Sequence, residues 1–312
     1  MPEVRLPTEA PRRKPPLRKR LIRTVGWIGF VGGGLVTPRL AGKAAARVWC
    51  KLPGNPGRRK DNRPWLGRIE MIDVGLTSPL AVETWEPFSG PEAVGTASDN
   101  PKTIWLMHGW GGWRGQVAAF VAPLTDAGFR VVAADALSHG DSGPGIDGAR
   151  HSSGGELMRS FDALAAKLGQ PDGVIAHSLG CAAVCRSYLS GRMTPERLTL
   201  VSPSPDMVQV ARQFARSLGF GRRAARMLVE EMERRAKGHL ADFDIAAMGA
   251  TGRLPDTLVI HDDADKESPY SVSQDIQARW PGVRLVTTHG LGHHRILIKP
   301  QVVEAAAANM SV

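Results

Sequence analysis

The chain has 312 residues, 42% of them hydrophobic, and a formal net charge of +10. This length provides enough apolar surface for one large domain with additional segments. The three cysteines, Cys50, Cys181 and Cys185, include no CxxC pair. Their sparseness argues against a disulfide scaffold and a structural zinc site, and it fits a reducing compartment. We therefore expect a cytoplasmic protein in which Cys181 and Cys185 are small buried side chains on a helix.

The positive charge is concentrated near the N-terminus. Residues 1–68 contain 17 Lys/Arg and 3 Asp/Glu, a balance of +14, whereas residues 69–312 contain 23 Lys/Arg and 27 Asp/Glu, a balance of −4. A nucleic-acid enzyme is expected to spread positive charge around its substrate groove. The longer part of the chain has no such excess, so we expect no nucleic acid as a partner.

The first 65 residues differ from the rest in composition and in hydrophobic pattern. Residues 1–23 are rich in proline and basic side chains, which predicts a disordered basic arm. Residues 24–65 are predicted to be an apolar, helical segment that begins with the run Val25–Val36, and this run is too short to span a bilayer. Residues 66–312 are predicted to form the main domain.

The apolar run near the N-terminus has several interpretations. One is a helical flap that rests on the domain, and another is peripheral contact of residues 12–36 with an anionic membrane. A signal peptide cleaved within Ala41–Ala46, or a solvated tail followed by a packed helix, would fit the same sequence.

From about residue 67, short apolar runs alternate with helical patterns, which predicts a doubly wound, mostly parallel α/β sheet. The predicted strands are Arg68–Val74, Leu80–Trp85, Thr103–Met107, Phe129–Ala134, Gly173–His177, Leu198–Ser202, Leu258–His261 and Val283–Thr287. The predicted helices are Gln116–Ala127, Glu156–Leu168, Leu179–Ser190, Tyr270–Trp280 and Gln301–Asn309. Residues 206–250 break the alternation of strands and helices, since two or three predicted helices lie between consecutive strands. This pattern indicates an insertion.

The strongest local signal surrounds Ser178. A β-branched strand runs directly into this serine and then into a helix of small residues. A nucleophile on such a sharp turn needs small neighbours two positions away on each side, and Ala176 and Gly180 supply them. The turn exposes the hydroxyl and directs helix N-terminal N–H groups at an oxygen beside it. The alternative is that Ser178 only caps the helix.

Two further turns follow predicted strands. The sequence after residue 107, His-Gly-Trp-Gly-Gly, allows close approach of the backbone, so the N–H groups of Trp110 and Leu179 can form an oxyanion hole. We interpret His108 as structural support for this turn. Residues 135–142, Asp-Ala-Leu-Ser-His-Gly-Asp-Ser, form a second polar turn in which Asp135 and Asp141 brace loops.

Carboxylates and histidines follow the last two predicted strands. Residues 261–269 read His-Asp-Asp-Ala-Asp-Lys-Glu-Ser-Pro, and residues 290–294 read Gly-Leu-Gly-His-His. These groups and Ser178 all lie beyond the carboxyl ends of parallel strands, where open sheets bind ligands. The chain order of serine, aspartate and histidine differs from the trypsin and subtilisin orders and agrees with that of α/β-hydrolases.

These segments, in this order and spacing, resemble the α/β-hydrolase superfamily, and most of all its bacterial esterase-like and lipase-like serine hydrolases. The resemblance covers about residues 66–310. It implies an eight-stranded sheet whose second strand is antiparallel, a Ser–His–Asp triad, and a helical lid at about residues 205–252. Ala176 departs from the glycine that the family pattern usually has there.

The resemblance also implies which acid and which base act. Asp265, four residues before Pro269, has the family's spacing for the triad acid, ahead of Asp262 and Asp263. Asp206 is the alternative, since some members take the acid from that position. His293 directly follows Gly-Leu-Gly and is favoured over His294 as the base.

Together these residues predict an esterase that works by acyl transfer. Ser178 would attack a lipid-like or small apolar ester, with His293 as base and Asp265 orienting it. We expect no metal and no organic cofactor. An acyltransferase or thioesterase would use the same triad, and a non-catalytic binding protein on this scaffold is the alternative from another class.

The predicted lid offers nine apolar side chains as lining of a substrate pocket or, equally, as its own packing face. They are Met207, Val208, Val210, Phe214, Leu218, Phe220, Met227, Leu228 and Met232.

Overall fold

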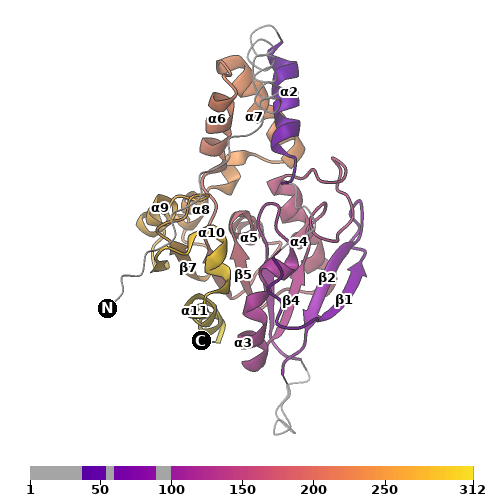
Figure 1. The fold of residues 1–312 in the computed structure, drawn as a ribbon, viewed down its shortest axis with the longest axis vertical. Helices are drawn as coiled ribbons and strands as arrows, with labels where there is room; N and C mark the ends of the chain where they lie inside the picture. The colour runs from indigo at the N-terminus through magenta and orange to yellow at the C-terminus, as the bar shows by residue number, and fades with distance from the viewer. Residues whose placement is uncertain (1–36, 54–59, 89–99, 312) are drawn as a thin grey trace, which may run out of the picture.

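The computed structural model describes residues 37–53, 60–88 and 100–311. Eight strands form one sheet in the order β1-β2-β4-β3-β5-β6-β7-β8 (Figure 1). Strand β2 is antiparallel to both of its neighbours, and the other pairs are parallel. The predicted eight-stranded α/β fold is therefore confirmed. The strands are β1 (Arg68–Ile72), β2 (Leu80–Trp85), β3 (Thr103–Met107), β4 (Arg130–Ala134), β5 (Gly173–His177), β6 (Arg197–Val201), β7 (Asp256–Asp262) and β8 (Arg284–Thr288).

Helices cover both faces of the sheet because the side chains of each buried strand alternate between two apolar clusters. One cluster joins the sheet to α4 (Gly154–Leu168), α5 (Leu179–Leu189), α8 (Ile245–Gly249) and α9 (Ser271–Arg279). The other joins it to α3 (Val121–Asp126) and α11 (Pro300–Ser311). The predicted burial of Cys181 and Cys185 is also confirmed, and Cys50 is buried as well.

The helix predicted over Gln116–Ala127 is wrong in its first half. Two 3-10 turns, η1 (Arg114–Gln116) and η2 (Ala118–Phe120), come first, and the α-helix begins only at Val121. The reason is Pro123, which a helix tolerates in its first turn but not in its interior. A helix that started at Gln116 would drive the proline ring into the carbonyl of Ala119.

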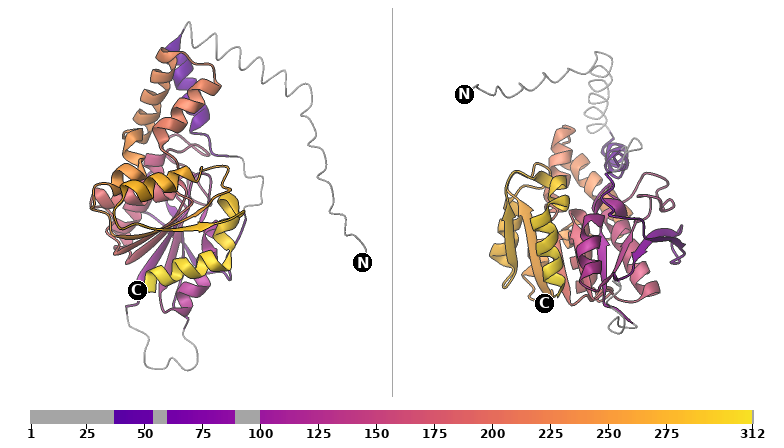
Figure 2. Two further views of the ribbon diagram at one scale, coloured as in Figure 1. Left: turned by 90° about the vertical axis from the view of Figure 1, so that its left-hand side faces the viewer. Right: turned by 60° about the horizontal axis from the view of Figure 1, so that its bottom comes forward.

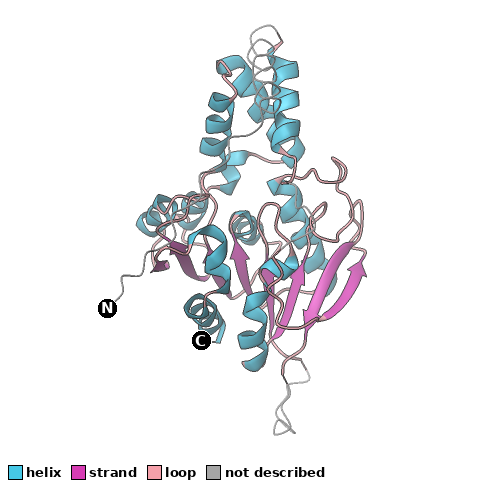
Figure 3. Cartoon of the chain, viewed as in Figure 1, coloured by secondary structure: helices cyan, strands magenta, loops and turns pink. Residues whose placement is uncertain are grey.

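Residues 205–252 form the predicted insertion between β6 and β7. It contains α6 (Met207–Ser217), α7 (Arg222–Ala236), η3 (Leu240–Phe243) and α8. Helices α6 and α7 project from the carboxyl edge of the sheet together with α2 (Pro38–Trp49), as Figures 1 and 2 show. Figure 3 shows that this projection consists of helices and loops without strands. We call α2, α6 and α7 the cap.

Helix α2 is held in the cap by small side chains. Ala45 and Ala46 are fully buried in one apolar cluster with Ala211 and Ala215 of α6 and Leu228 of α7. The ring centroids of Trp49 and Phe214 lie 5.1 Å apart. The region Ala41–Ala46, considered above as a cleavage region, is thus part of a packed helix. The basic arm and the run Val25–Val36 lie outside the described residues.

Candidate functional site

The turn at Ser178 has the geometry that its small neighbours predict. Ser178 adopts φ 54° and ψ −121°, a conformation that non-glycine residues rarely adopt. A Cβ atom on Gly109 would lie 2.7 Å from Cβ of Ser178, and one on Gly180 would lie 2.7 Å from the carbonyl oxygen of His108. Glycine at both positions therefore lets the turn after β3 pack directly on the start of α5.

Ser178, His293 and Asp265 are joined by hydrogen bonds. Oγ of Ser178 lies 3.1 Å from Nε2 of His293, and Nδ1 of His293 lies 2.7 Å from Oδ2 of Asp265. Three separate turns, after β5, β7 and β8, bring these side chains to one edge of the sheet. The other acid considered, Asp206, accepts the N–H of Val208 as the N-cap of α6.

The carboxyl of Asp265 is held in its ionised form. Its side chain is fully buried, which opposes ionisation, but hydrogen bonds from His261 and His293 and the N–H of Ser268 lower its pKa far below the ordinary range. Nε2 of His261 lies 3.4 Å from the same carboxylate oxygen that contacts His293. An ionised acid at this place fixes the tautomer of His293 with its proton on Nδ1, so that Nε2 faces Ser178 as an acceptor.

Asp262 holds the loop that carries His293. Its two oxygens accept hydrogen bonds from the N–H groups of Gly292 (2.8 Å) and Leu291 (2.9 Å) and from the Thr288 hydroxyl (2.8 Å). Burial opposes ionisation here too, but these bonds lower the pKa of Asp262. The neighbouring Asp263 instead pairs with the exposed His289 at the surface. This role of Asp262 was not predicted from the sequence, where the one available signal is an acid at the end of a buried strand.

His177, directly before the serine, is a second group that sequence reasoning missed. Its Nε2 donates to the carbonyl oxygen of His293 at 3.0 Å, and the two ring centroids lie 4.7 Å apart. Burial and the proximity of His293 lower the pKa of His177 well below its ordinary value. The ring therefore stays neutral while it supports His293.

The two residues predicted to form an oxyanion hole, Trp110 and Leu179, lie at the turn after β3 and at the start of α5. Leu179 is the first residue of α5, so its N–H has no acceptor within the helix. Trp110 follows Gly109 in a tight turn that is closed by a hydrogen bond from the N–H of Gly112 to the carbonyl of Gly109 (3.0 Å). His108 supports this turn as expected, since its Nδ1 bonds the carbonyl of Gly109 (2.8 Å) and its Nε2 accepts the N–H of Ala136 (3.1 Å).

A buried network of ion pairs holds the segment that follows the turn at Trp110, where η1 and η2 lie. Arg114 is 3% exposed and pairs with Asp135 and, through Nε at 3.0 Å, with Glu83, both of which are fully buried. The N–H of Asp141 also bonds Asp135 at 2.8 Å. These contacts agree with the structural role expected for Asp135, and they explain how a chain segment of 3-10 turns stays fixed beside the site.

The cavity at Ser178 has a volume of about 360 Å³ and a wall that is about half polar and half apolar. Gln116, His294 and Glu267 form a chain across it, with Gln116 Nε2 3.2 Å from His294 Nδ1 and His294 Nε2 3.0 Å from Glu267 Oε1. Burial lowers the pKa of His294, although Glu267 opposes this shift. Among the described residues that line this cavity, Glu267 is the only one with a carboxylate, and none is a Lys or an Arg.

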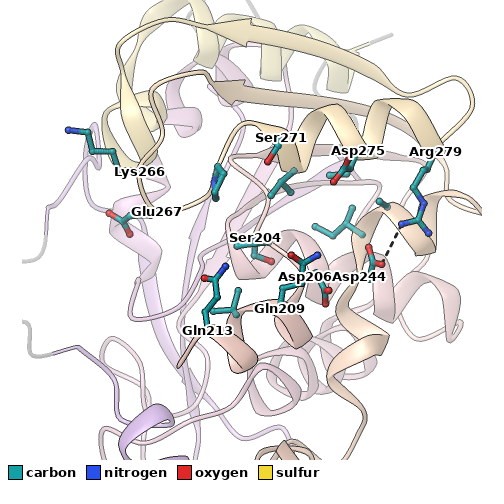
Figure 4. Close-up of a pocket in the computed structure, with 17 residues that line it drawn as sticks. Ser204, Asp206, Gln209, Gln213, Asp244, Lys266, Glu267, Ser271, Asp275 and Arg279 are labelled. Carbon is teal, nitrogen blue, oxygen red and sulfur yellow. Dashed lines mark ion pairs between the residues drawn. The ribbon is translucent and has the colours of Figure 1, made fainter. Parts of the chain in front are cut away.

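A second cavity of similar size, about 350 Å³, lies between the insertion and α9 (Figure 4). It shares Glu267 with the first cavity and contains Asp206, Asp244 and Arg279 but not Ser178. Asp244 and Arg279 approach each other to 3.6 Å there.

None of the nine apolar side chains offered as pocket lining contributes to the cavity at Ser178. Most of them pack within the cap, which is the second of the two interpretations given above. Met207 and Met232 line only a small void beside Leu179, and Val210 lines the second cavity.

The alpha/beta hydrolase family matches residues 106–306, which include all of the strands from β4 onward and the site. The chain belongs to this family. Membership supports a hydrolase as its broad functional class. No curated protein is similar enough in sequence to match the chain.

Solved structures share this fold at low sequence identity. Est1E from Butyrivibrio proteoclasticus, solved with ferulic acid bound, is 18% identical with a TM-score of 0.59, and the match covers 78% of this chain and 100% of that one. A hydrolase from Pseudomonas aeruginosa PA01 is 21% identical with a TM-score of 0.54, covering 78% and 98%. A thioesterase domain from the curacin biosynthetic pathway is 15% identical with a TM-score of 0.54, covering 78% and 99%.

Among the described residues, no helix is both long enough and apolar enough to cross a lipid bilayer.

Proposed function

We propose that this family member is a serine hydrolase that cleaves carboxylic esters through an acyl-enzyme. Ser178 is the nucleophile, His293 the general base and Asp265 the acid that orients it. The observation that supports this assignment is the pair of hydrogen bonds from Ser178 to His293 (3.1 Å) and from His293 to Asp265 (2.7 Å). Helix capping alone does not explain Ser178, since its side chain makes no cap hydrogen bond in α5.

The reaction proceeds in two steps. Nε2 of His293 removes the proton of Ser178 as Oγ forms a bond to the ester carbonyl carbon. The N–H groups of Trp110 and Leu179 stabilise the oxyanion, and His293 returns the proton to the leaving alcohol. In the second step His293 activates a water molecule, which releases the carboxylic acid and restores Ser178.

The lining of the cavity favours small esters that carry a hydrogen-bonding group over long acyl chains. Gln116, His294 and Glu267 present polar atoms to the bound substrate, and the apolar side chains of the cap lie elsewhere. The carboxylate of Glu267 disfavours an anionic substrate and favours a neutral or cationic one. A series of p-nitrophenyl esters tests this choice: kcat/KM is expected to decrease beyond short acyl chains and to be lower for hemisuccinate-type esters than for neutral esters of equal length.

The assignment of the nucleophile is tested with the Ser178→Ala variant. We expect it to lower kcat/KM for a short ester by about 10⁴-fold or more, since the alkoxide cannot form. Ser204→Ala is the matched control. Ser204 is a nearby buried serine whose Oγ has no hydrogen-bond partner in the described part of the chain. Comparable hydrolysis by wild type and Ser178→Ala would contradict the assignment.

A further inference from the structure

The charges of the cap are segregated along its length. Helix α2 and residues 207–229 contain eight Lys/Arg and no Asp or Glu, and all eight are exposed. The acids of α7 begin at Glu230. They lie in the half of the helix near the sheet and the helices that cover it, which we call the body. There Glu231 pairs with Arg234 at 2.7 Å and with Arg235 at 2.9 Å, and Arg235 reaches Asp147 at 2.9 Å. The half of the cap near the body is thus charge-compensated, and the outer half is not.

The packing of α2 against α7 places the basic side chains of the outer half together. A Cβ atom on Gly42 would lie 2.7 Å from Cβ of Met227, so the first turns of α2 lie beside the first turns of α7. The turn between α6 and α7 lies at the same outer end (Figures 1 and 2). We call this end the basic tip, and its six residues are Arg39, Lys43, Arg216, Arg222, Arg223 and Arg226. Among described residues its one ion pair is between Arg226 and Glu230, at 3.6 Å with both side chains mostly exposed.

An apolar residue is exposed among these charges. Leu40, between Arg39 and Lys43 in the first turns of α2, is 65% exposed. Leu218 and Phe220 lie half-buried in the turn between α6 and α7. A cationic surface with a protruding apolar side chain suits the interface of a bilayer, where the charges meet lipid phosphates and the apolar group enters the headgroup region.

We propose that the basic tip docks on membranes that contain anionic lipids. The chain enters α2 at the tip, and the sequence just before it carries seven Lys/Arg within residues 12–23 and the apolar run Val25–Val36. The basic tip and the sequence of residues 12–36 are therefore neighbours along the chain, and both combine basic residues with apolar ones. The cap leaves the sheet at its carboxyl edge, which also carries Ser178, so docking turns that edge of the enzyme toward the lipid surface.

The test uses sedimentation of the full chain with vesicles of phosphatidylcholine, with and without phosphatidylserine. Wild type is compared with Arg222→Glu/Arg223→Glu. Acidic residues are favourable in the first turn of a helix, so this variant is expected to keep α7 folded, which circular dichroism checks. Lys167→Glu/Arg253→Glu is the control, because it makes the same change of net charge at exposed positions on the body.

We expect the tip variant to lower partition into phosphatidylserine vesicles by at least about tenfold and the control to change it less than about twofold. Wild-type binding is expected to weaken as salt is raised to about 0.15 M and to be absent on pure phosphatidylcholine. Equal binding by wild type and the tip variant, equal losses in both variants, or no binding by wild type would overturn the proposal. Binding of the tip to a DNA duplex, with no binding to vesicles, would likewise overturn it.

Discussion

The edge of the sheet that carries Ser178, His293 and Asp265 is held together by a different kind of contact from that in the cap. At the edge, the backbone is constrained position by position: Ser178 has φ 54°, and Gly109 and Gly180 allow contacts that a Cβ atom would prevent. In the cap, α2 packs against α7, a helix more than 170 residues later in the chain, through buried alanine and leucine side chains and the close approach at Gly42, and none of these side chains contacts Ser178 or His293 by a hydrogen bond. Substitutions at the edge should therefore affect catalysis, and substitutions in the cap should affect stability or surface binding.

The largest effect is expected from Asp265→Asn. Replacing a triad carboxylate by an amide can lower kcat by about 10⁴-fold, because the histidine then adopts the wrong tautomer. The matched control is Asp206→Asn, which changes only the N-cap of α6. Steady-state kinetics on a short ester checks both variants. If Asp206→Asn lost most of its kcat while Asp265→Asn kept it, the triad acid would be Asp206, after β6, and not Asp265.

Asp262→Asn should have an intermediate effect. The amide replaces an oxygen that accepts from Gly292 or Leu291, so the loop that carries His293 loses a hydrogen bond. A shift of the base by about 1 Å can lower kcat by about 10²-fold. Asp263→Asn, which disrupts only the exposed pair with His289, is expected to stay near wild type in kcat. Equal kcat values for the two variants would show that Asp262 does not position His293.

In the cap, the substitution expected to lower stability is Gly42→Val. The new side chain meets Met227 and the backbone of Leu228 at less than 3 Å, and overpacking of this kind lowers the free energy of unfolding by about 1–3 kcal/mol. Ala44→Val, at an exposed position of the same helix, is expected to lose less than about 0.7 kcal/mol. Urea unfolding measures both. Loss of esterase activity without loss of stability in Gly42→Val would show that the cap is coupled to the edge.

The smallest expected effect is on how the free energy of unfolding depends on pH. His177 has a lowered pKa when folded, so below about pH 6.5 the unfolded chain takes up a proton that the folded chain does not. This side chain therefore makes stability decrease as pH falls, by up to about 1.4 kcal/mol per pH unit. Between pH 7 and pH 5 we expect His177→Gln to lose about 1–2 kcal/mol less than wild type in urea unfolding. Parallel losses in both proteins would contradict a neutral, buried His177.

Sequence reasoning reached the sheet and the candidate site because both depend on local patterns. Buried strands show as apolar runs, and the turn at Ser178 requires small residues at fixed positions. It did not predict that α2 joins the cap, since small apolar side chains such as Ala45 do not specify their partner in the sequence. It also missed His177, His261 and Asp262, whose roles depend on loops that meet only after folding. The helix at Gln116–Ala127 failed for a local reason, Pro123, which was visible in the sequence.

The central claim is that Ser178 is activated by His293. It is tested most directly by reacting the full chain with a fluorophosphonate and locating the adduct by mass spectrometry. A single adduct on Ser178 is expected, which is absent from Ser178→Ala and forms much more slowly in His293→Ala. An adduct on another serine such as Ser204, or labelling of Ser178 at an unchanged rate in His293→Ala, would contradict the account.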